Sequence, residues 1–225
     1  MQDKPLFLVT GATGGIGQSA CQILSEKGFV PVVCYRKPKE VLGQTVAQDC
    51  GGIAIELDLS DASSISNAIE TLKADGRTVG GVCLLASPPP ILKRFTHTDV
   101  NDLKLFWEVN VLGNQVLLSA IISEFFRKNK KGYVCAALTA AMGESGQAGM
   151  SHMGSYVVSK FGLQGILSVV QAEYPWLSVH SIKPTYTDTS MLEAFDERWI
   201  EQVRKTQGIM EPHDVAQELL EHVAL

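Results

Sequence analysis

A glycine-rich turn near the N-terminus constrains this chain more than any other feature: Thr10-Gly11-Ala12-Thr13-Gly14-Gly15-Ile16-Gly17. An apolar run at residues 6–9 precedes it, and apolar residues at helical spacing follow it as far as Gly28, a plausible helix terminator. This order predicts a strand, a tight turn and a helix. Glycines let the backbone approach a pyrophosphate, and the first N–H groups of a helix favour negative charge. The turn therefore predicts a dinucleotide site.

Two other chemistries do not match the sequence patterns. No lysine follows Gly17, so the turn differs from the P-loop of nucleoside triphosphatases. A serine-hydrolase elbow needs a glycine two positions after its serine, and Gln147 occupies that place after Ser145.

Length and charge bound the domain count and the class of partner. The chain has 225 residues, 45% of them hydrophobic, which suffices for one α/β core, so a single domain over residues 1–225 is expected. The net charge is −5, and no basic block stands out. We therefore expect a small-molecule partner and neither nucleic acid nor a membrane. No apolar stretch is expected to span a bilayer.

Cysteines and histidines argue against disulfides and metal. The cysteines are odd in number, lack CxxC spacing and mostly lie in apolar patterns, which is typical of reduced core residues in a cytoplasmic protein. The first apolar run is only as long as a strand, so no secretory signal is expected. The histidines show no ligand spacing, and no metal site is expected. These residues are Cys21, Cys34, Cys50, Cys83 and Cys135, and His97, His180, His213 and His222.

Strands and helices alternate along the chain. After the first strand, apolar runs predict strands at residues 29–35, 53–57, 82–86, 133–138 and 177–182. Helical patterns are expected at about residues 65–72, 98–127, 155–172 and 192–206, and a last helix begins at Pro212. This alternation favours a parallel sheet with helices on both faces, whose ligands bind beyond the carboxyl ends of the strands.

Tyr156 and Lys160 lie four positions apart, which places a phenol and an ammonium on one face of the predicted helix. A free phenol, with a pKa near 10, transfers protons poorly at neutral pH. Lowering that pKa to about 7 takes about 4 kcal/mol, and one ammonium about 4 Å away supplies that much at an effective dielectric constant of about 20. The spacing therefore predicts an activated tyrosine.

These motifs together resemble the compact, single-domain branch of the short-chain dehydrogenases/reductases. The resemblance rests on the glycine turn, Asp58-Leu59-Ser60, Asn110 within Val109–Gly113, and Tyr156-Val157-Val158-Ser159-Lys160, in the family's order. The extended branch shares the glycine turn but carries a further substrate domain, for which 225 residues leave no room. The resemblance implies a Rossmann-type, doubly wound parallel sheet in three α/β/α layers.

Site residues follow from the resemblance. Tyr156 would give a proton to a carbonyl oxygen, Lys160 would hold the nicotinamide ribose and polarise Tyr156, and Asn110 would organise a water relay from Lys160 to solvent. Gly11, Gly15 and Gly17 would line the pyrophosphate and Asp58 would bind the adenine. Thr189, with Thr187 as the alternative, would hold the carboxamide. The other expected cofactor contacts are Thr13, Gly14, Ile16, Leu59, Ala86 and Pro184.

The chain departs from the family pattern at three places near the nicotinamide. The family's catalytic serine corresponds to Thr139, which has the required hydroxyl; Ser145, Ser151 and Ser155 are alternatives. An Asn-Asn-Ala-Gly turn is replaced by Leu84-Leu85-Ala86-Ser87, and a Pro-Gly by Pro184-Thr185. The function expected is NADPH-dependent reduction of a ketone or aldehyde, 3-oxoacyl compounds included. A regulatory or scaffold protein that binds NADP(H) without turnover is the alternative.

The cofactor expectation rests on the end of the second strand. NAD-selective folds place an acid there, whereas this chain has Arg36 and Lys37, which favours NADPH over NADH. Side chains expected to flank an apolar substrate are Met142, Met150, Met153, Met191, Phe195 and Trp199, with His152 nearby.

Assembly is expected to involve the two long apolar helices. Family members usually add a seventh strand and a tail, whereas this chain ends at Leu225, so a six-stranded sheet is expected. The apolar helices at about residues 110–126 and 155–172 match the family's dimer helices, which implies a homodimer.

Overall fold

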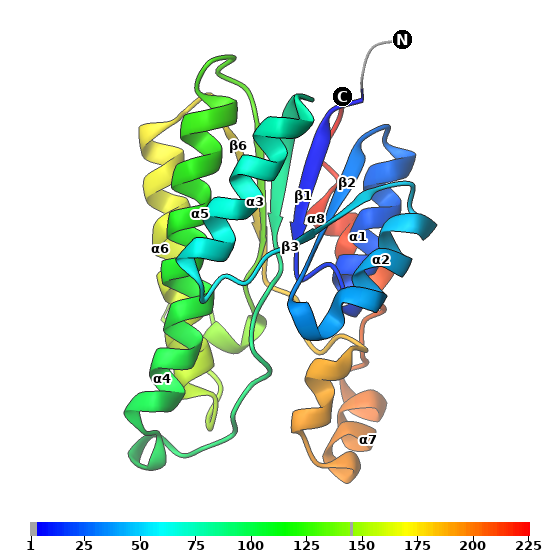
Figure 1. The fold of residues 1–225 in the computed structure, drawn as a ribbon. Helices are drawn as coiled ribbons and strands as arrows, with labels where there is room; N and C mark the ends of the chain where they lie inside the picture. Colours follow the sequence, from blue (N-terminus) through cyan, green and yellow to red (C-terminus); the bar gives the residue numbers. More distant parts are fainter. Residues whose placement is uncertain (1–3, 145) are drawn as a thin grey trace.

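The computed structural model describes residues 4–144 and 146–225, which form one parallel sheet between two layers of helices (Figure 1). Its six strands run in the order β3-β2-β1-β4-β5-β6. Their bounds are β1 Leu6–Thr10, β2 Val30–Tyr35, β3 Ile53–Glu56, β4 Val79–Leu84, β5 Tyr133–Ala137 and β6 Ser178–Ile182. The predicted doubly wound sheet of six strands is thereby confirmed within the described residues.

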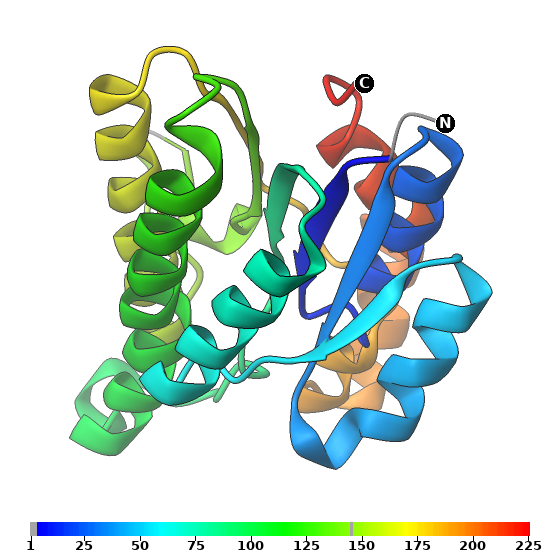
Figure 2. The same ribbon diagram turned by 45° about the horizontal axis from the view of Figure 1, so that its top comes forward.

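Helices cover both faces of the sheet (Figures 1 and 2). One face packs against α1, α2 and α8, and the other against α3, α5 and α6. The α-helices are α1 Gly15–Glu26, α2 Glu40–Asp49, α3 Ala62–Asp75, α4 Val100–Trp107, α5 Asn114–Ile121, α6 Gly154–Glu173, α7 Glu197–Thr206 and α8 Pro212–Leu219. Gly28, predicted to terminate the first helix, has a φ of +91° just after α1.

The sheet carries the core because its central strands are buried on both faces. Every residue of β1 is buried, and its side chains alternate between the two helix layers. Residues Leu6 and Leu8 face α3 and α5, whereas Phe7 and Val9 face α1 and α8. The continuous apolar run that predicted this strand follows from that double burial.

One continuous helix occupies nearly all of the range predicted for it, residues 98–127. From Val100 to Phe126 it passes through α4, a π-helical turn at Glu108–Gly113, α5 and a second π-helical turn at Ile122–Phe126. Its most apolar window has a mean hydropathy of 1.4, and half of that window is buried inside the fold. The expectation that no stretch has the length and composition of a membrane span is therefore wrong for this helix. Its buried side chains, among them Leu117, Leu118 and Ile121, pack in the core beneath the sheet, whereas Leu112 and Val116 on the other side are exposed.

Three elements differ from the sequence expectation. Helix α2 was not identified, because its exposed Val41 and a central Gly43 obscure the apolar pattern. The helix expected at residues 192–206 is split, since Asp196 caps a new helix through the N–H groups of Arg198 and Trp199. Strand β4 begins earlier than predicted and includes two glycines, where side chains would collide with neighbouring aromatic rings.

Candidate active site

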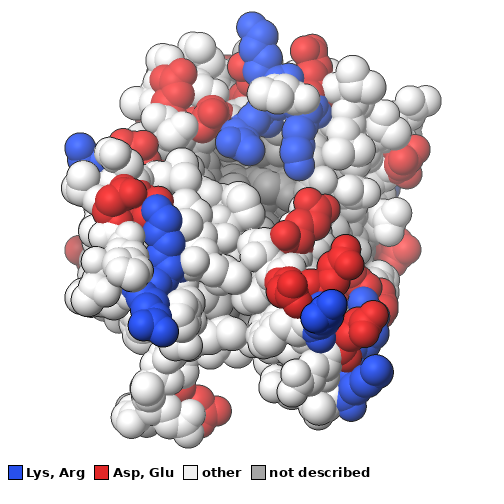
Figure 3. Space-filling view, turned by 90° about the horizontal axis from the view of Figure 1, so that it is seen from below, with Lys and Arg blue, Asp and Glu red and all other residues white. Residues whose placement is uncertain are grey.

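A cavity of about 1210 Å³ opens where the carboxyl ends of the strands meet. Figure 3 shows this face of the molecule, with a hollow whose rim carries a group of Lys and Arg side chains. The structure brings all the residues assigned to a cofactor into this one cavity: Gly11, Thr13, Gly14, Gly15, Ile16, Gly17, Arg36, Asp58, Leu59, Ala86, Pro184, Thr187 and Thr189. Tyr156, Lys160 and Thr139 line it as well, whereas Asn110 does not.

The glycine turn forms one end of the cavity, and its geometry requires glycine. Gly11 has a φ of +68°, and a Cβ there would lie 2.8 Å from the backbone nitrogen of Ala86. A Cβ on Gly17 would lie 2.3 Å from the carbonyl oxygen of Gly11. Helix α1 begins at Gly15 with no side-chain cap, so its first N–H groups are available to an anion. The backbone therefore offers a fitting cradle for a pyrophosphate.

Thr10 fixes the unusual turn after β4, a role that sequence reasoning missed. Its hydroxyl donates to the carbonyl of Cys83 at 3.1 Å and accepts from the N–H groups of Leu85 and Ala86 at 3.0 and 3.2 Å. The Leu84–Ser87 turn, which replaces the Asn-Asn-Ala-Gly pattern, is thus held in place by Thr10, a buried residue at the end of β1. The alternation of strands gave no signal for this contact, because it joins residues far apart in the chain.

The adenosine end of the cavity combines one carboxylate with basic side chains. Asp58 accepts the N–H of Ser60 at 2.9 Å and its hydroxyl at 2.6 Å, both on Oδ1. Those bonds orient the carboxylate of Asp58, which lines the cavity. Arg36 and Lys39 line the cavity after β2, and Lys39 replaces Lys37 as the second basic residue of this rim.

Tyr156 and Lys160 come from α6, and Thr139 comes from the end of β5. Lys160 donates from Nζ to the carbonyl of Ala137 at 2.7 Å, and its Nζ lies 5.6 Å from the centre of the Tyr156 ring. Thr139 accepts the N–H of Ala141 on its hydroxyl oxygen at 3.2 Å. That bond occupies a lone pair and leaves the hydroxyl hydrogen to donate. Three groups that can hold or transfer a proton therefore meet in one place.

Burial dominates the electrostatics of this trio. It raises the pKa of Tyr156 to about 12, although the nearby hydroxyl of Thr139 offsets part of that rise. Burial also lowers the pKa of Lys160 to about 8. The predicted lowering of the Tyr156 pKa is therefore wrong for the chain alone, because burial of the phenol raises that pKa and the Thr139 hydroxyl offsets only part of the rise. A phenol with this pKa is fully protonated at neutral pH.

Asn110 supports the site from outside the cavity. Its side-chain amide nitrogen donates to the hydroxyls of Ser87 and Ser159 at 3.1 and 2.9 Å, and its backbone carbonyl accepts from the side-chain amide of Asn114 at 3.0 Å. Its Oδ1 is buried without a partner among the described residues. These contacts tie the turn after β4 to α6, and the water relay from Lys160 stays a prediction.

The serines that were alternatives to Thr139 lie in different places. Ser155 is buried but does not line the cavity, Ser151 is exposed, and Ser145 lies outside the described residues. Thr187 and Thr189 both line the cavity, and each hydroxyl is within 3.4 Å of a backbone carbonyl two residues earlier. Among the described hydroxyls weighed for the serine's place, Thr139 shares the cavity with Tyr156 and lies within hydrogen-bonding reach of its phenol.

Apolar side chains form the remaining wall. Met150, Met153, Met191 and Phe195 line the cavity, as expected. Two other expected residues lie behind it: Met142 is buried in the core, and Trp199 stacks on Phe195 at 4.7 Å between ring centres. His152 is exposed, has a φ of +66° and does not line the cavity. Tyr186, which the sequence did not single out, also lines the wall.

Comparison with known proteins supports this geometry. The family model for short chain dehydrogenase matches residues 6–199. The cyclohexanol dehydrogenase of Acinetobacter sp. (strain SE19) is 23% identical over 228 residues, a match that covers 96% of this chain and 86% of that relative.

Two solved structures show the same fold. The 3-ketoacyl-(acyl-carrier-protein) reductase of Brucella melitensis, complexed with NADH, superposes with a TM-score of 0.84 at 17% identity, covering 97% of this chain and 90% of that one. An alcohol dehydrogenase of the archaeon Thermococcus sibiricus, complexed with 5-hydroxy-NADP, gives a TM-score of 0.80 at 20% identity, covering 99% and 94%.

Proposed function

The chain belongs to the short chain dehydrogenase family of NAD(P)-dependent oxidoreductases, and we propose that it reduces a carbonyl compound to an alcohol with NADPH. The observation that carries this proposal is the meeting of Tyr156, Lys160 and Thr139 in the cavity that the glycine turn closes at its other end. A binding protein without turnover needs only the turn. The buried lysine and phenol beside a hydroxyl are costly to maintain and useful for proton transfer.

The side chains divide the proton chemistry among them. Thr139 donates its hydroxyl hydrogen to the carbonyl oxygen of the substrate, since its oxygen already accepts the Ala141 N–H. Tyr156, protonated at neutral pH, gives its proton to the same oxygen as negative charge develops there. Lys160 holds its ammonium over the Tyr156 ring and stabilises the resulting phenolate. The bound nicotinamide supplies the hydride to the carbonyl carbon.

The preference for NADPH is supported by charge at the adenosine end. Arg36 and Lys39 border the cavity just beyond β2, where an acidic residue would bind the ribose hydroxyls of NAD. Arginine and lysine match a 2′-phosphate instead. The two superposed relatives carry NADH in one case and a modified NADP in the other, so this preference rests on the residues of this chain.

An apolar carbonyl compound fits the substrate wall. The methionines and Phe195 adapt to apolar shapes, and the cyclohexanol dehydrogenase among the relatives is named for an apolar cyclic alcohol. We also propose a cytoplasmic location, supported by five free and buried cysteines.

We further propose that the chain forms a homodimer through the long helix and α6. Nine large apolar side chains of these helices are more than a third exposed: Val100, Leu103, Leu105, Trp107, Leu112, Val116, Val158, Phe161 and Val169. Light scattering should give twice the monomer mass at micromolar concentration, whereas a monomer would contradict the proposal. Phe161→Glu should dissociate the dimer.

Deuterium transfer tests the proposed reaction directly. Purified protein is incubated with NADPH deuterated at C4 and a panel of apolar ketones and aldehydes, and the alcohols are analysed by mass spectrometry. We expect deuterium on the carbinol carbon with one stereochemistry. If NADPH binds with micromolar affinity but no alcohol in the panel gains deuterium, the protein is a nucleotide sensor and the proposal fails.

A further inference from the structure

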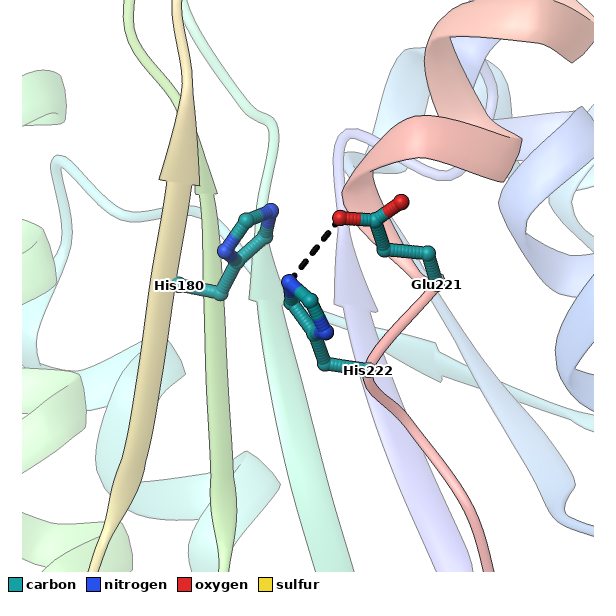
Figure 4. A group of neighbouring side chains, drawn as sticks. All are labelled: His180, Glu221 and His222. Atoms are coloured by element: carbon teal, nitrogen blue, oxygen red, sulfur yellow. Dashed lines mark ion pairs between the residues drawn. The ribbon is translucent and has the colours of Figure 1, made fainter.

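A cluster of three side chains lies at the edge of the sheet, away from the cavity. His180 belongs to β6, which is the edge strand next to β5, and Glu221 and His222 follow the end of α8. Figure 4 shows both imidazole rings and the carboxylate converging between the strand and the C-terminal segment. Nitrogen and oxygen atoms offered by the three residues all lie within 4.8 Å of one another.

The contacts within the cluster leave ligand atoms available. The Nε2 of His222 lies 2.9 Å from a carboxylate oxygen of Glu221, and the two imidazole rings pack edge to face with their centres 4.6 Å apart. The Nε2 of His180 is buried and has no hydrogen-bond partner among the described residues. A buried imidazole nitrogen without a partner costs free energy, which a bound ion would recover.

We propose that His180, Glu221 and His222 bind a divalent transition-metal ion of the zinc class. Two imidazoles and a carboxylate form a donor set typical of zinc. Ligand atoms around a tetrahedral zinc ion are about 3.3 Å apart, so atoms that now lie up to 4.8 Å apart must approach by about 1.5 Å at most. Glu221 and His222 are more than half exposed, which allows that movement and leaves a fourth position for water. Magnesium and calcium prefer oxygen donors and do not fit two imidazoles.

Such an ion would tie the C-terminal segment to the sheet. Helix α8 packs on α1, and Pro212 at its start lies close to Gly15 of the glycine turn. The ion therefore stabilises the layer that supports the turn without touching the cavity. Sequence spacing could not reveal this site, because the strand pairing and the packing of α8 bring His180 to its partners. The expectation of no metal site rested on that spacing alone.

Zinc binding by tag-free protein tests this proposal. The full chain is treated with a chelator, dialysed and titrated with ZnCl2 by calorimetry, and its thermal unfolding is followed with and without zinc. We expect one ion per chain with a Kd in the micromolar range, and a rise in Tm of about 5–10 °C at a hundredfold excess over Kd. MgCl2 should give no shift. Bound Co²⁺ should show the visible bands of nitrogen and oxygen coordination.

Matched variants locate the site. His222→Ala and His180→Ala should each weaken zinc binding by about 30-fold or more, and Glu221→Gln by about tenfold. His213→Ala and Glu218→Gln, which lie on α8 outside the cluster, should change it by less than twofold. Because His222 is exposed, its variant keeps the test decisive even if His180→Ala unfolds. A Kd above about 1 mM, or equal binding by wild type and a His180→Ala/His222→Ala double variant, would overturn the proposal.

Discussion

The two ends of the cavity differ in which atoms line them, backbone at one end and side chains at the other. At the glycine turn the surface is mainly backbone from one short segment, whereas around Tyr156 it is side chains from β5, α6 and the loops after β4 and β6. The first end depends on a local conformation that few residues other than glycine can adopt. The second depends on contacts between distant elements. A site formed by local backbone can therefore be predicted from a sequence pattern, whereas a site formed by side chains of distant elements can be predicted only in part.

Changing Gly11 should have the largest effect on the backbone end. Gly11→Ala places a Cβ 2.8 Å from the nitrogen of Ala86 at a φ of +68°, so we expect a loss of about 2–4 kcal/mol in the free energy of unfolding and at least a hundredfold weaker NADPH binding. Denaturant titration and fluorescence of bound NADPH measure the two effects.

Gly76→Ala provides the control for backbone strain. Gly76 also has a positive φ, +80°, but nothing lies within 4 Å of its added Cβ. Its variant should lose stability through strain alone and keep its NADPH affinity. Equal affinity losses in both variants would show that strain, and not the local cradle, governs binding.

Thr139 tests the side-chain end. Thr139→Ala removes the proposed donor to the carbonyl oxygen, and we expect kcat for ketone reduction to fall by about 100-fold while the Kd for NADPH stays within twofold. Thr139→Ser keeps the hydroxyl and should retain most of the activity. If the serine variant is as slow as the alanine variant, the methyl group matters for packing and the hydroxyl has no role in catalysis.

Arg36 combines the two kinds of site, because its side chain adds to the anion site that the backbone of the glycine turn forms. Arg36→Asp should weaken NADPH binding by about 30-fold through loss of a charge-assisted hydrogen bond, and should leave or improve NADH binding. Titration of both cofactors gives the ratio. An unchanged NADPH affinity would remove the argument for the 2′-phosphate.

The pH dependence should expose the buried lysine. Because burial lowers the pKa of Lys160 to about 8 while Tyr156 stays protonated until about 12, kcat/KM for reduction should fall up to tenfold per pH unit above about 8. In the same range the unfolded chain binds the Lys160 proton more tightly than the native one, so Lys160 makes the free energy of unfolding rise with pH between about 8 and 10.5. The buried thiols of Cys21, Cys34 and Cys83 act in the opposite direction above about pH 9, so this rise is measured as the difference between wild type and Lys160→Met. Lys160→Met should abolish that rise, and an unaltered rise would contradict the assignment to Lys160.

The sequence predicted the architecture well because its signals are local. Apolar runs identified all six strands, and the glycine turn located the cavity. It did not identify α2, whose Gly43 fits against the ring of Tyr35, nor the hydroxyl of Thr10 that holds the turn after β4. The lowered pKa expected for Tyr156 was wrong because burial, which depends on the whole fold, raises that pKa by more than the Thr139 hydroxyl lowers it. Contacts between residues far apart in the chain leave no local pattern in the sequence, so they could not be predicted from it.

The separation of binding from chemistry is tested most directly by Tyr156→Phe. This change removes the proton donor and keeps the ring, which packs edge to face on Phe106. Measured on the same preparation, kcat for the best ketone should fall by about 10³-fold and the Kd for NADPH should stay within twofold of the wild-type value. Retained turnover in the phenylalanine variant would contradict the account, because the proton would then come from another group.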